Sequence, residues 1–372
     1  MEIKTPLPEA TLAATSQQLA RLRTVLQQHS DLPDSASVQT LFTLLVQSGL
    51  ADLPAPGAGQ TLARWQMLAE VAAHDLALVK LFEGHTDAIA ALHEVSEGAF
   101  KPPADSLWGL WAAEAPGSRV VFETSADADG ATGAIVLQGK KAWCSGAQTV
   151  THGLLTVWPT ANAAEPSAGP YLAAVALNQP GVQTSIQGWH AVGMAYSASG
   201  HVTFESASAV LVGQAGAYLR RPGFWQGGAG VAACWYGGAA MLGRALHQAV
   251  STSTASNPFR EAALGKVDLA LLSTAALLRE AAAWIDANPG TDASVWAWRT
   301  RLAAETTART VLDEVGRALG ATPFCRNPRF ARMAADLPVF VRQSHAERDF
   351  AALGAQLALI PKRLDTQSVW AL

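Results

Sequence analysis

Charge is scarce in this sequence of 372 residues. Charged side chains make up 15% of it, whereas ordinary globular proteins carry about 25%. The 26 Lys and Arg residues nearly balance the 30 Asp and Glu residues, and they form no long basic cluster. We therefore expect no nucleic-acid partner, because nucleic-acid-binding surfaces need clustered basic residues. We also expect a surface with so little charge to be partly covered by other subunits, in a homodimer or homotetramer.

Cysteine is scarce as well, and long apolar runs are missing. The three cysteines, Cys144, Cys234 and Cys325, lie far apart, which excludes a disulfide framework and a C-x-x-C zinc site. The nine histidines show no metal-ligand spacing, so no metal is expected. Every stretch of about 18 residues contains polar residues, so we expect no membrane-spanning helix. Met1–Pro6 lacks the features of a signal peptide, so the expected location is a reducing cytoplasm.

The hydrophobic pattern changes twice along the chain and predicts an α+β multidomain fold. Residues 1–104 carry apolar residues at helical spacing and are expected to form an N-terminal helical domain. Residues 105–213 contain short β-type runs between turn signals, typical of a central antiparallel β-domain in the form of a sandwich or barrel. Residues 214–372 return to long helices with short connections, which predicts a C-terminal four-helix bundle.

The expected helices follow from apolar spacing and capping residues. Asn257-Pro258 is an N-cap and first-turn pair, and Asp292 can cap the following helix. The Gly- and Ala-rich run 227–240 allows close helix contact, and we predict that it forms the oligomer interface. In chain order, the predicted helices span residues 8–28, 35–49, 61–82, 85–95, 228–250, 257–288, 292–319 and 336–354.

Several common catalytic motifs are missing. No G-x-G-x-x-G motif follows a predicted strand, and neither H-E-x-x-H nor G-x-S-x-G occurs. A Rossmann dehydrogenase, a zinc enzyme and a serine hydrolase are therefore poorly supported. The aromatic cluster between Tyr218 and Tyr236 is compatible with core packing, a pocket wall or a subunit interface.

The densest signal lies in the predicted β-domain, where a strand ends in Trp143-Cys144-Ser145-Gly146. A planar indole can cover a flat heterocycle while a hydroxyl group next to it bonds the edge of that ring. The alternative is a core tryptophan followed by a strand-end turn. A second segment, Gly193-Met194 to Gly213, continues into a strand.

These segments resemble the acyl-CoA dehydrogenase superfamily. Leu137–Gly146 matches the family pattern L-x-G-x-K-x-W-[IC]-[ST]-[NG], Gly193–Gly213 matches a second pattern in outline, and Ala113–Ser118 matches a third weakly. The resemblance implies a helical domain, a β-domain and a helical bundle around a bound FAD. It also implies roles for Trp143 and Ser145, which would flank the isoalloxazine and bond its N5 edge.

The resemblance implies two further cofactor contacts. Ser118 would lie near the flavin or the substrate entrance, and Arg260 would meet the pyrophosphate. The motif that holds the adenine end of FAD is degraded to Asp313–Gly320.

The chain departs from the family at its catalytic base. In the family, a glutamate that follows an Arg-Asp pair late in the chain removes the α-proton of an acyl thioester. Here Ala335-Asp336 replaces the pair, and counting onward leads to Ser344-His345. No acidic residue occurs between Glu205 and Glu261, which closes the family's other position for this base. The candidate catalytic residues are therefore His345, Glu347 and Ser344, and the alternative is a helix surface with ion pairs.

Three functions remain open. The main prediction is an acyl-CoA dehydrogenase-like FAD-dependent oxidoreductase that lacks the usual glutamate and oxidises a C–C bond of an acyl thioester or related substrate. The first alternative is a reduced-flavin-dependent monooxygenase of the same fold, because His345 can act on a proton near neutral pH. The second is a non-catalytic scaffold that has lost flavin. The expected partners are a small-molecule substrate, possibly acyl-CoA, and a flavin reductase or electron-transfer protein.

Overall fold

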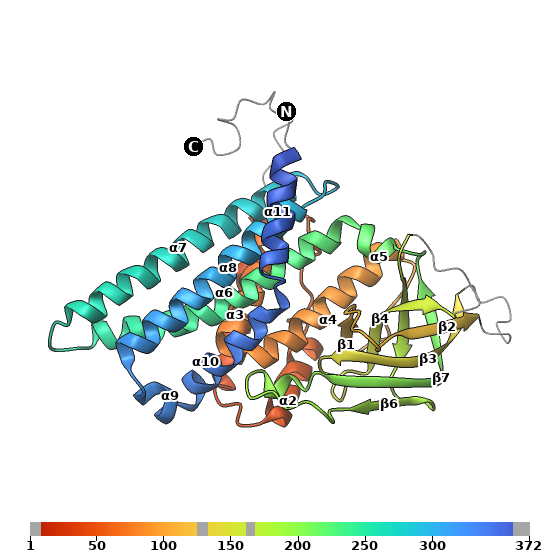
Figure 1. Ribbon diagram of the computed structural model, residues 1–372, viewed down its shortest axis with the longest axis horizontal. Helices are drawn as coiled ribbons and strands as arrows, with labels where there is room; N and C mark the ends of the chain where they lie inside the picture. The colour runs from red at the N-terminus through yellow and green to blue at the C-terminus, as the bar shows by residue number, and fades with distance from the viewer. Residues whose placement is uncertain (1–8, 125–132, 161–167, 360–372) are drawn as a thin grey trace.

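The computed structural model describes residues 9–124, 133–160 and 168–359. Helices come first, strands follow, and long helices close the chain, as the resemblance implied (Figure 1). The strands lie at one end of the molecule and α7 at the other. The helices before the strands are α1 (Glu9–Gln28), α2 (Ser35–Gln47), α3 (Thr61–His74) and α4 (Leu76–Val95).

One helical boundary in this part of the chain differs from the prediction. The predicted helices 61–82 and 85–95 are divided at Asp75 instead, so that α4 runs unbroken through Gly84. The Asp75 carboxylate accepts a hydrogen bond from the Leu78 backbone N–H at 2.8 Å and caps α4. The break therefore follows from a capping side chain within the apolar pattern, which spacing alone does not reveal.

The strands form one seven-stranded sheet, which is mixed rather than wholly antiparallel. Strand β4 pairs in parallel with β1 and β2, and the remaining pairs are antiparallel. Because β4 also pairs with β5, the strands β2, β3, β7, β5 and β4 close into a ring. The strands are β1 (Trp108–Trp111), β2 (Val120–Thr124), β3 (Ala134–Cys144), β4 (His152–Pro159), β5 (Tyr171–Ala176), β6 (Val182–Ser185) and β7 (Gly200–Val212).

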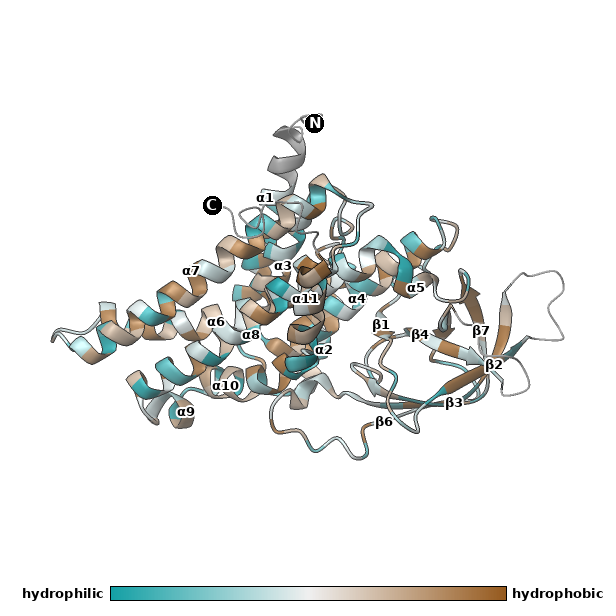
Figure 2. Cartoon of the chain, turned by 45° about the horizontal axis from the view of Figure 1, so that its top comes forward, coloured by the Kyte–Doolittle hydropathy of each residue, from teal (hydrophilic) through white to brown (hydrophobic). Residues whose placement is uncertain are grey.

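The long helices after the strands carry apolar and polar residues in alternation, as helices with one buried face do (Figure 2). The Asn257 cap is confirmed, because its side chain accepts from the first turn of α7. Asp292 lies one residue before the N-cap Ala293 and accepts from Ser294 N at 2.9 Å. These helices are α5 (Ala217–Arg220), α6 (Pro222–Ser251), α7 (Pro258–Ala287), α8 (Ser294–Leu319), α9 (Thr322–Arg326), α10 (Pro328–Phe340) and α11 (Glu347–Leu359).

The predicted last helix, 336–354, is wrong at both ends. Helix α10 begins at Pro328, where the Asn327 side chain caps it, and a 3-10 turn (Val341–Gln343) follows. Ser344 is then extended, with φ −66° and ψ 143°, and Ala346 has a positive φ of 45°. Ser344, His345 and Ala346 therefore form a break before α11, and helical spacing does not govern where Ser344 and His345 point.

The Gly- and Ala-rich run of α6 packs inside the chain, which corrects its predicted role as the oligomer interface. A Cβ atom on Gly237 would lie 2.2 Å from the Ala69 carbonyl oxygen of α3, so the two helix backbones touch at this glycine. Trp235 in the same run is fully buried. The described helices include none with the length and apolar character needed to cross a lipid bilayer.

Candidate active site

A cavity of about 730 Å³ lies where the strands meet α4, α6, α8 and the segment after α10. The residues that line this cavity form two groups, which differ in chemistry. The strand wall consists of Trp143, Ser145, Trp189, Ser197 and Ser199. The helix wall consists of Lys80, Glu83, Asp87, Gly227, Gly228, Trp298 and Arg301.

Trp143 reaches the strand wall because its backbone leaves the regular strand. Its φ is +60°, and the register between β3 and β7 shifts between Ala142 and Cys144, which marks a β-bulge. The bulge turns the indole outward, where it is 60% exposed and lies edge-on to Trp189 at 6.3 Å between ring centroids. Trp143 is therefore not a core tryptophan, and its face is available to a flat ligand.

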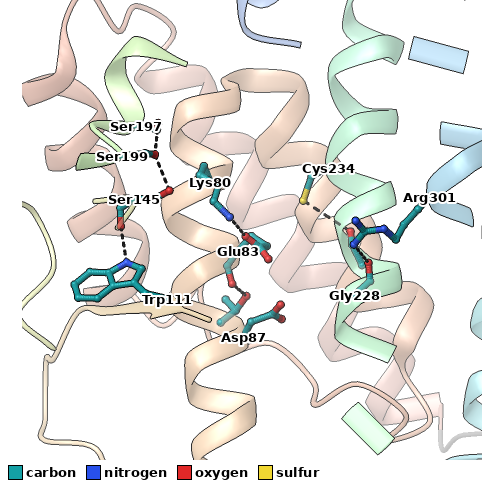
Figure 3. A network of polar contacts seen from close by, with 12 residues as sticks. Lys80, Glu83, Asp87, Trp111, Ser145, Ser197, Ser199, Gly228, Cys234 and Arg301 are labelled. Atoms are coloured by element: carbon teal, nitrogen blue, oxygen red, sulfur yellow. Dashed lines mark hydrogen bonds and ion pairs between the residues drawn. The ribbon is translucent and has the colours of Figure 1, made fainter. Parts of the chain in front are cut away.

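Three serine hydroxyls form a chain in the strand wall. Ser145 Oγ lies 2.7 Å from Ser199 Oγ, which in turn lies 2.9 Å from Ser197 Oγ (Figure 3). The Trp111 indole N–H donates to the Ser145 carbonyl oxygen at 3.1 Å and fixes the turn after β3. Because hydroxyl groups both donate and accept, this chain can adjust to a ligand edge of either kind.

The loop that carries Met194 and Ser197 is anchored from α10. Met194 adopts a positive φ of 61°, and its backbone N–H donates to Asp336 Oδ1 at 2.5 Å. A Cβ atom on Gly193 would lie 2.0 Å from the Ala335 carbonyl oxygen, so the loop backbone presses against α10. Burial raises the pKa of Asp336 to about 6. Asp336, which the sequence aligned with the family's Arg-Asp pair, therefore positions the strand wall.

The helix wall contains charged side chains that the sequence analysis did not single out. Lys80, Glu83 and Asp87 lie along one face of α4, and Lys80 Nζ is 2.9 Å from Glu83 Oε2. Asp87 Oδ1 is 2.6 Å from the buried Arg64 guanidinium of α3. Burial and the neighbouring Asp87 carboxylate raise the pKa of Glu83, against the effect of Lys80. The available signal was three ionisable residues at helical spacing within an otherwise apolar segment.

Two glycines keep the cavity open opposite these carboxylates. A Cβ atom on Gly227 would lie 3.6 Å from Asp87 Oδ2, whereas a Cβ atom on Gly228 would meet nothing within 4 Å. A chain of edge-to-face aromatic rings continues the wall, with neighbouring centroids 5.5, 5.2 and 5.1 Å apart. The rings belong, in order, to Tyr218, Phe224, Trp225 and Trp298.

Of the predicted catalytic residues, only His345 lines the cavity. Its Nδ1 lies 3.5 Å from Asp349 Oδ1, and its backbone N–H donates to the same carboxylate. The side chain is 63% exposed, so the ring is accessible. Glu347 is exposed and lies outside the cavity lining, and the Ser344 hydroxyl accepts from the Ala346 N–H.

Of the predicted cofactor contacts, Trp143 and Ser145 share the cavity, but Ser118 and Arg260 do not line it. The buried Ser118 hydroxyl donates to the Lys140 carbonyl oxygen at 3.0 Å. Arg260 Nε donates to the Ala318 carbonyl oxygen at 3.1 Å, on the bundle. The roles of Ser118 and Arg260 toward a flavin therefore stay predictions.

The fold is similar to that of several solved enzymes, although no family model and no curated protein matches the sequence. KijD3, in complex with FMN and dTDP-3-amino-2,3,6-trideoxy-4-keto-3-methyl-D-glucose, is 16% identical, with a TM-score of 0.74 over 99% of this chain and 98% of that chain. TdsC from Paenibacillus sp. A11-2, in complex with FMN and indole, is 17% identical, with a TM-score of 0.70 over 93% of this chain and 96% of that chain. Methanesulfinate monooxygenase MsuC from Pseudomonas fluorescens is 19% identical, with a TM-score of 0.70 over 94% and 96%.

These proteins have the acyl-CoA dehydrogenase-like fold, and this chain therefore has it too. The resemblance inferred from Leu137–Gly146 is confirmed at the level of the fold.

Proposed function

We propose that this protein is a flavin-dependent monooxygenase that uses reduced flavin supplied by a partner reductase. One observation carries the proposal: His345 lines the same cavity as Trp143 and Ser145, while Glu347 lies outside it. In such a reaction one oxygen atom of O₂ enters the substrate, the other leaves as water, and reduced flavin supplies the two electrons. The structural similarity to MsuC and TdsC supports this alternative better than the acyl-CoA dehydrogenase that the sequence favoured.

The strand wall suits a flavin. A half-exposed indole beside a chain of hydroxyl groups offers a flat apolar face and hydrogen bonds to a ring edge. When bound there, the flavin would activate O₂, while Trp143 and Ser145 would hold its ring. We propose FMN rather than the FAD expected from the sequence. The FMN in KijD3 and TdsC and the degraded adenine motif at residues 313–320 support this choice.

His345 would act on a proton at the open side of the cavity. Its Nδ1 lies 3.5 Å from Asp349 Oδ1, and attraction to this carboxylate would leave Nε2 for the cavity contents. Arg301, 4.0 Å from Asp349, holds that carboxylate in turn. The buried Asp349 carboxylate would thus orient the imidazole of His345.

The test compares oxygenation with dehydrogenation in one preparation. Wild-type protein receives photoreduced FMN, oxygen and indole, and mass spectrometry looks for products heavier by one oxygen atom. We expect oxygen-dependent product, a loss of about 10²–10⁴-fold in His345→Ala, and little change in Glu347→Gln. Anaerobic mixing of the FMN- or FAD-loaded protein with octanoyl-CoA provides the contrasting assay.

Rapid bleaching of the oxidised flavin band by octanoyl-CoA, without oxygenated product, would overturn the proposal in favour of a dehydrogenase. Flavin binding is measured separately by fluorescence titration with FMN and FAD. Trp143→Ala and Ser145→Ala should weaken it, and Trp296→Ala, a half-buried tryptophan outside the cavity lining, is the control that should not. A protein that binds neither flavin would support the scaffold alternative.

A further inference from the structure

The charged face of α4 is unusual for its surroundings. Glu83 and Asp87 are 7% and 9% exposed, and Arg64 behind them is 1% exposed, in a chain with little charge overall. Burying ionised groups costs several kcal/mol each, even when they are paired. Charges that also line a cavity are candidates for a function within it, because apolar residues would pack that wall at lower cost.

Glu83 occupies the central position on this face. Lys80 binds one of its carboxylate oxygens, and Asp87 follows one helical turn later with its own cation, Arg64. Figure 3 shows Glu83 between the serines of the strand wall and the Gly228–Arg301 side of the helix wall. The titratable and charged groups around Glu83 are Lys80 and Asp87 of α4, Arg64 of α3, Tyr218 of α5, Cys234 of α6 and Arg301 of α8.

The cavity that Glu83 lines has room for a flat ring. A Cβ atom on Gly228, which lines the same cavity, would meet nothing within 4 Å, and the aromatic chain from Tyr218 to Trp298 lines the cavity with ring edges and faces. An aromatic ligand gains edge-to-face contacts there. A ligand group that donates a hydrogen bond would find a carboxylate acceptor in the same wall.

We propose that Glu83 is the proton acceptor of this site, and that the substrate is a flat aromatic molecule with an O–H or N–H group. This inference rests on the proposed function. The O–H or N–H bond breaks as the proton moves to the Glu83 carboxylate, and its electron pair stays on the substrate. The Lys80 ammonium, 2.9 Å from Glu83 Oε2, stays in place when Glu83 takes up the proton. Its positive charge then balances the negative charge that passes to the substrate. After oxygen insertion, the proton returns to the same heteroatom of the product.

The electrostatics suit this role. A carboxylate in water is too weak a base for such a proton, and burial with Asp87 nearby raises the pKa of Glu83. Asp87 is paired with Arg64, and Glu83 is paired with Lys80 through Oε2. The other residues of the helix wall would position the aromatic ring of the substrate.

The test uses 4-nitrophenol, whose phenol and phenolate forms differ in colour, and 4-nitroanisole, which has the same shape without the proton. Neither measurement needs flavin or oxygen. Wild-type protein should bind 4-nitrophenol about tenfold or more tightly than 4-nitroanisole, because a hydrogen bond to a charged acceptor is lost in the ether. The bound phenol should also absorb with partial phenolate character below its own pKa.

Glu83→Gln should abolish the phenolate character and reduce the preference for the phenol to about twofold or less. Glu70→Gln, which changes an exposed carboxylate paired with Arg23, is the matched control and should behave as wild type. Gly228→Leu leaves every charge in place but fills the space beside the pair, so both compounds should bind at least tenfold more weakly. If circular dichroism shows that Glu83→Gln does not fold, the preference of wild-type protein for the phenol and the phenolate absorption of the bound phenol still test the inference.

An unchanged preference and an unchanged spectrum in Glu83→Gln, or unchanged binding in Gly228→Leu, would overturn the inference. If binding behaves as expected but no oxygenated product forms with reduced FMN, the proposed function fails and the assignment of Glu83 survives. If wild-type protein oxygenates indole but shows no preference for the phenol, only the assignment of Glu83 fails.

Discussion

The strand wall and the helix wall enclose one cavity with opposite chemistry. The strand wall offers indoles and a hydroxyl chain, without a charged side chain among the five residues that define it. The helix wall places Lys80, Glu83, Asp87 and Arg301 in or near the interior. The first wall can adapt to a ligand edge through rotating hydroxyls. The second has partners fixed by Coulombic attraction, and it resists rearrangement.

The two walls also differ in what holds them in place. The strand wall relies on neutral hydrogen bonds and on one outside carboxylate, Asp336, which anchors its loop. The helix wall relies on ion pairs shared between neighbouring helices, such as Arg64 with Asp87. Removing one partner should therefore have a much larger effect in the helix wall than in the strand wall.

The largest expected effect follows Arg64→Met. The guanidinium binds Asp87, Thr86 Oγ1 and the Pro54 carbonyl oxygen, and its loss leaves the buried Asp87 carboxylate without a cation. We expect the free energy of unfolding to fall by about 3–5 kcal/mol in urea titrations. Adding Asp87→Asn should restore part of the loss, because the uncompensated charge is then removed.

Arg23→Met is the matched control for this experiment. It breaks an exposed pair with Glu70, and the expected change is about 1 kcal/mol or less. Equal losses in Arg64→Met and Arg23→Met would show that the helix wall does not depend on its buried ions.

An intermediate effect, which depends on pH, is expected from Asp336→Asn. Because the folded-state pKa of Asp336 is raised from 3.8 to about 6, the folded state holds its proton more tightly than the unfolded state. Wild-type stability should therefore be lost as the pH rises from about 4 to about 6. Asn keeps an oxygen that can accept from Met194 N–H but does not titrate.

The difference in unfolding free energy between Asp336→Asn and wild type should shift by about 3 kcal/mol in favour of the variant between pH 4 and pH 7. Thermal and urea unfolding across this range measure it. Asp313→Asn, at an exposed pair with Arg317, is the matched control. A pH-independent difference would mean that Asp336 does not titrate in this range.

The smallest effect is expected from Ser199→Ala. The substitution removes hydroxyl contacts with Ser145 and Ser197, but Ser197 keeps its hydrogen bond to the Met194 carbonyl oxygen at 2.8 Å. We expect a loss of about 1–2 kcal/mol in urea unfolding, and less for the exposed control Ser253→Ala. A loss as large as that of Arg64→Met would show that the two walls are held with similar strength.

Much of the fold was predictable because local signals agree with the tertiary structure. Apolar spacing located most helices, Asn257 capped the helix predicted for it, Asp292 accepts from the first residue of the next helix, and residues 105–213 carried the turn signals of a β-region. The predictions failed where a contact between residues distant in sequence, or a single capping side chain, outweighed the apolar spacing. Asp75 divides two helices through its own side chain, and the parallel pairing of β4 joins strands that no turn connects.

The residues of the candidate site divide in the same way, into those that a local motif located and those whose position depends on the tertiary structure. Trp143 and Ser145 belong to one short motif, so the sequence by itself determined that they lie together at the end of a strand. His345 was found by counting along the chain, but its direction depends on the break at Ser344–Ala346.

Only the tertiary structure decided that Glu83 and Asp87 face this cavity. In the sequence, Lys80, Glu83 and Asp87 are three ionisable residues at helical spacing in a mostly apolar segment, and this pattern does not show what the helix face that carries them meets. Their role depends on Arg64, Gly228 and Arg301, which come from three other helices and meet α4 only after the chain has packed. A motif is determined by neighbours along the chain, whereas burial, which sets the cost of a charge and the pKa of a carboxyl, exists only once distant segments exclude water together.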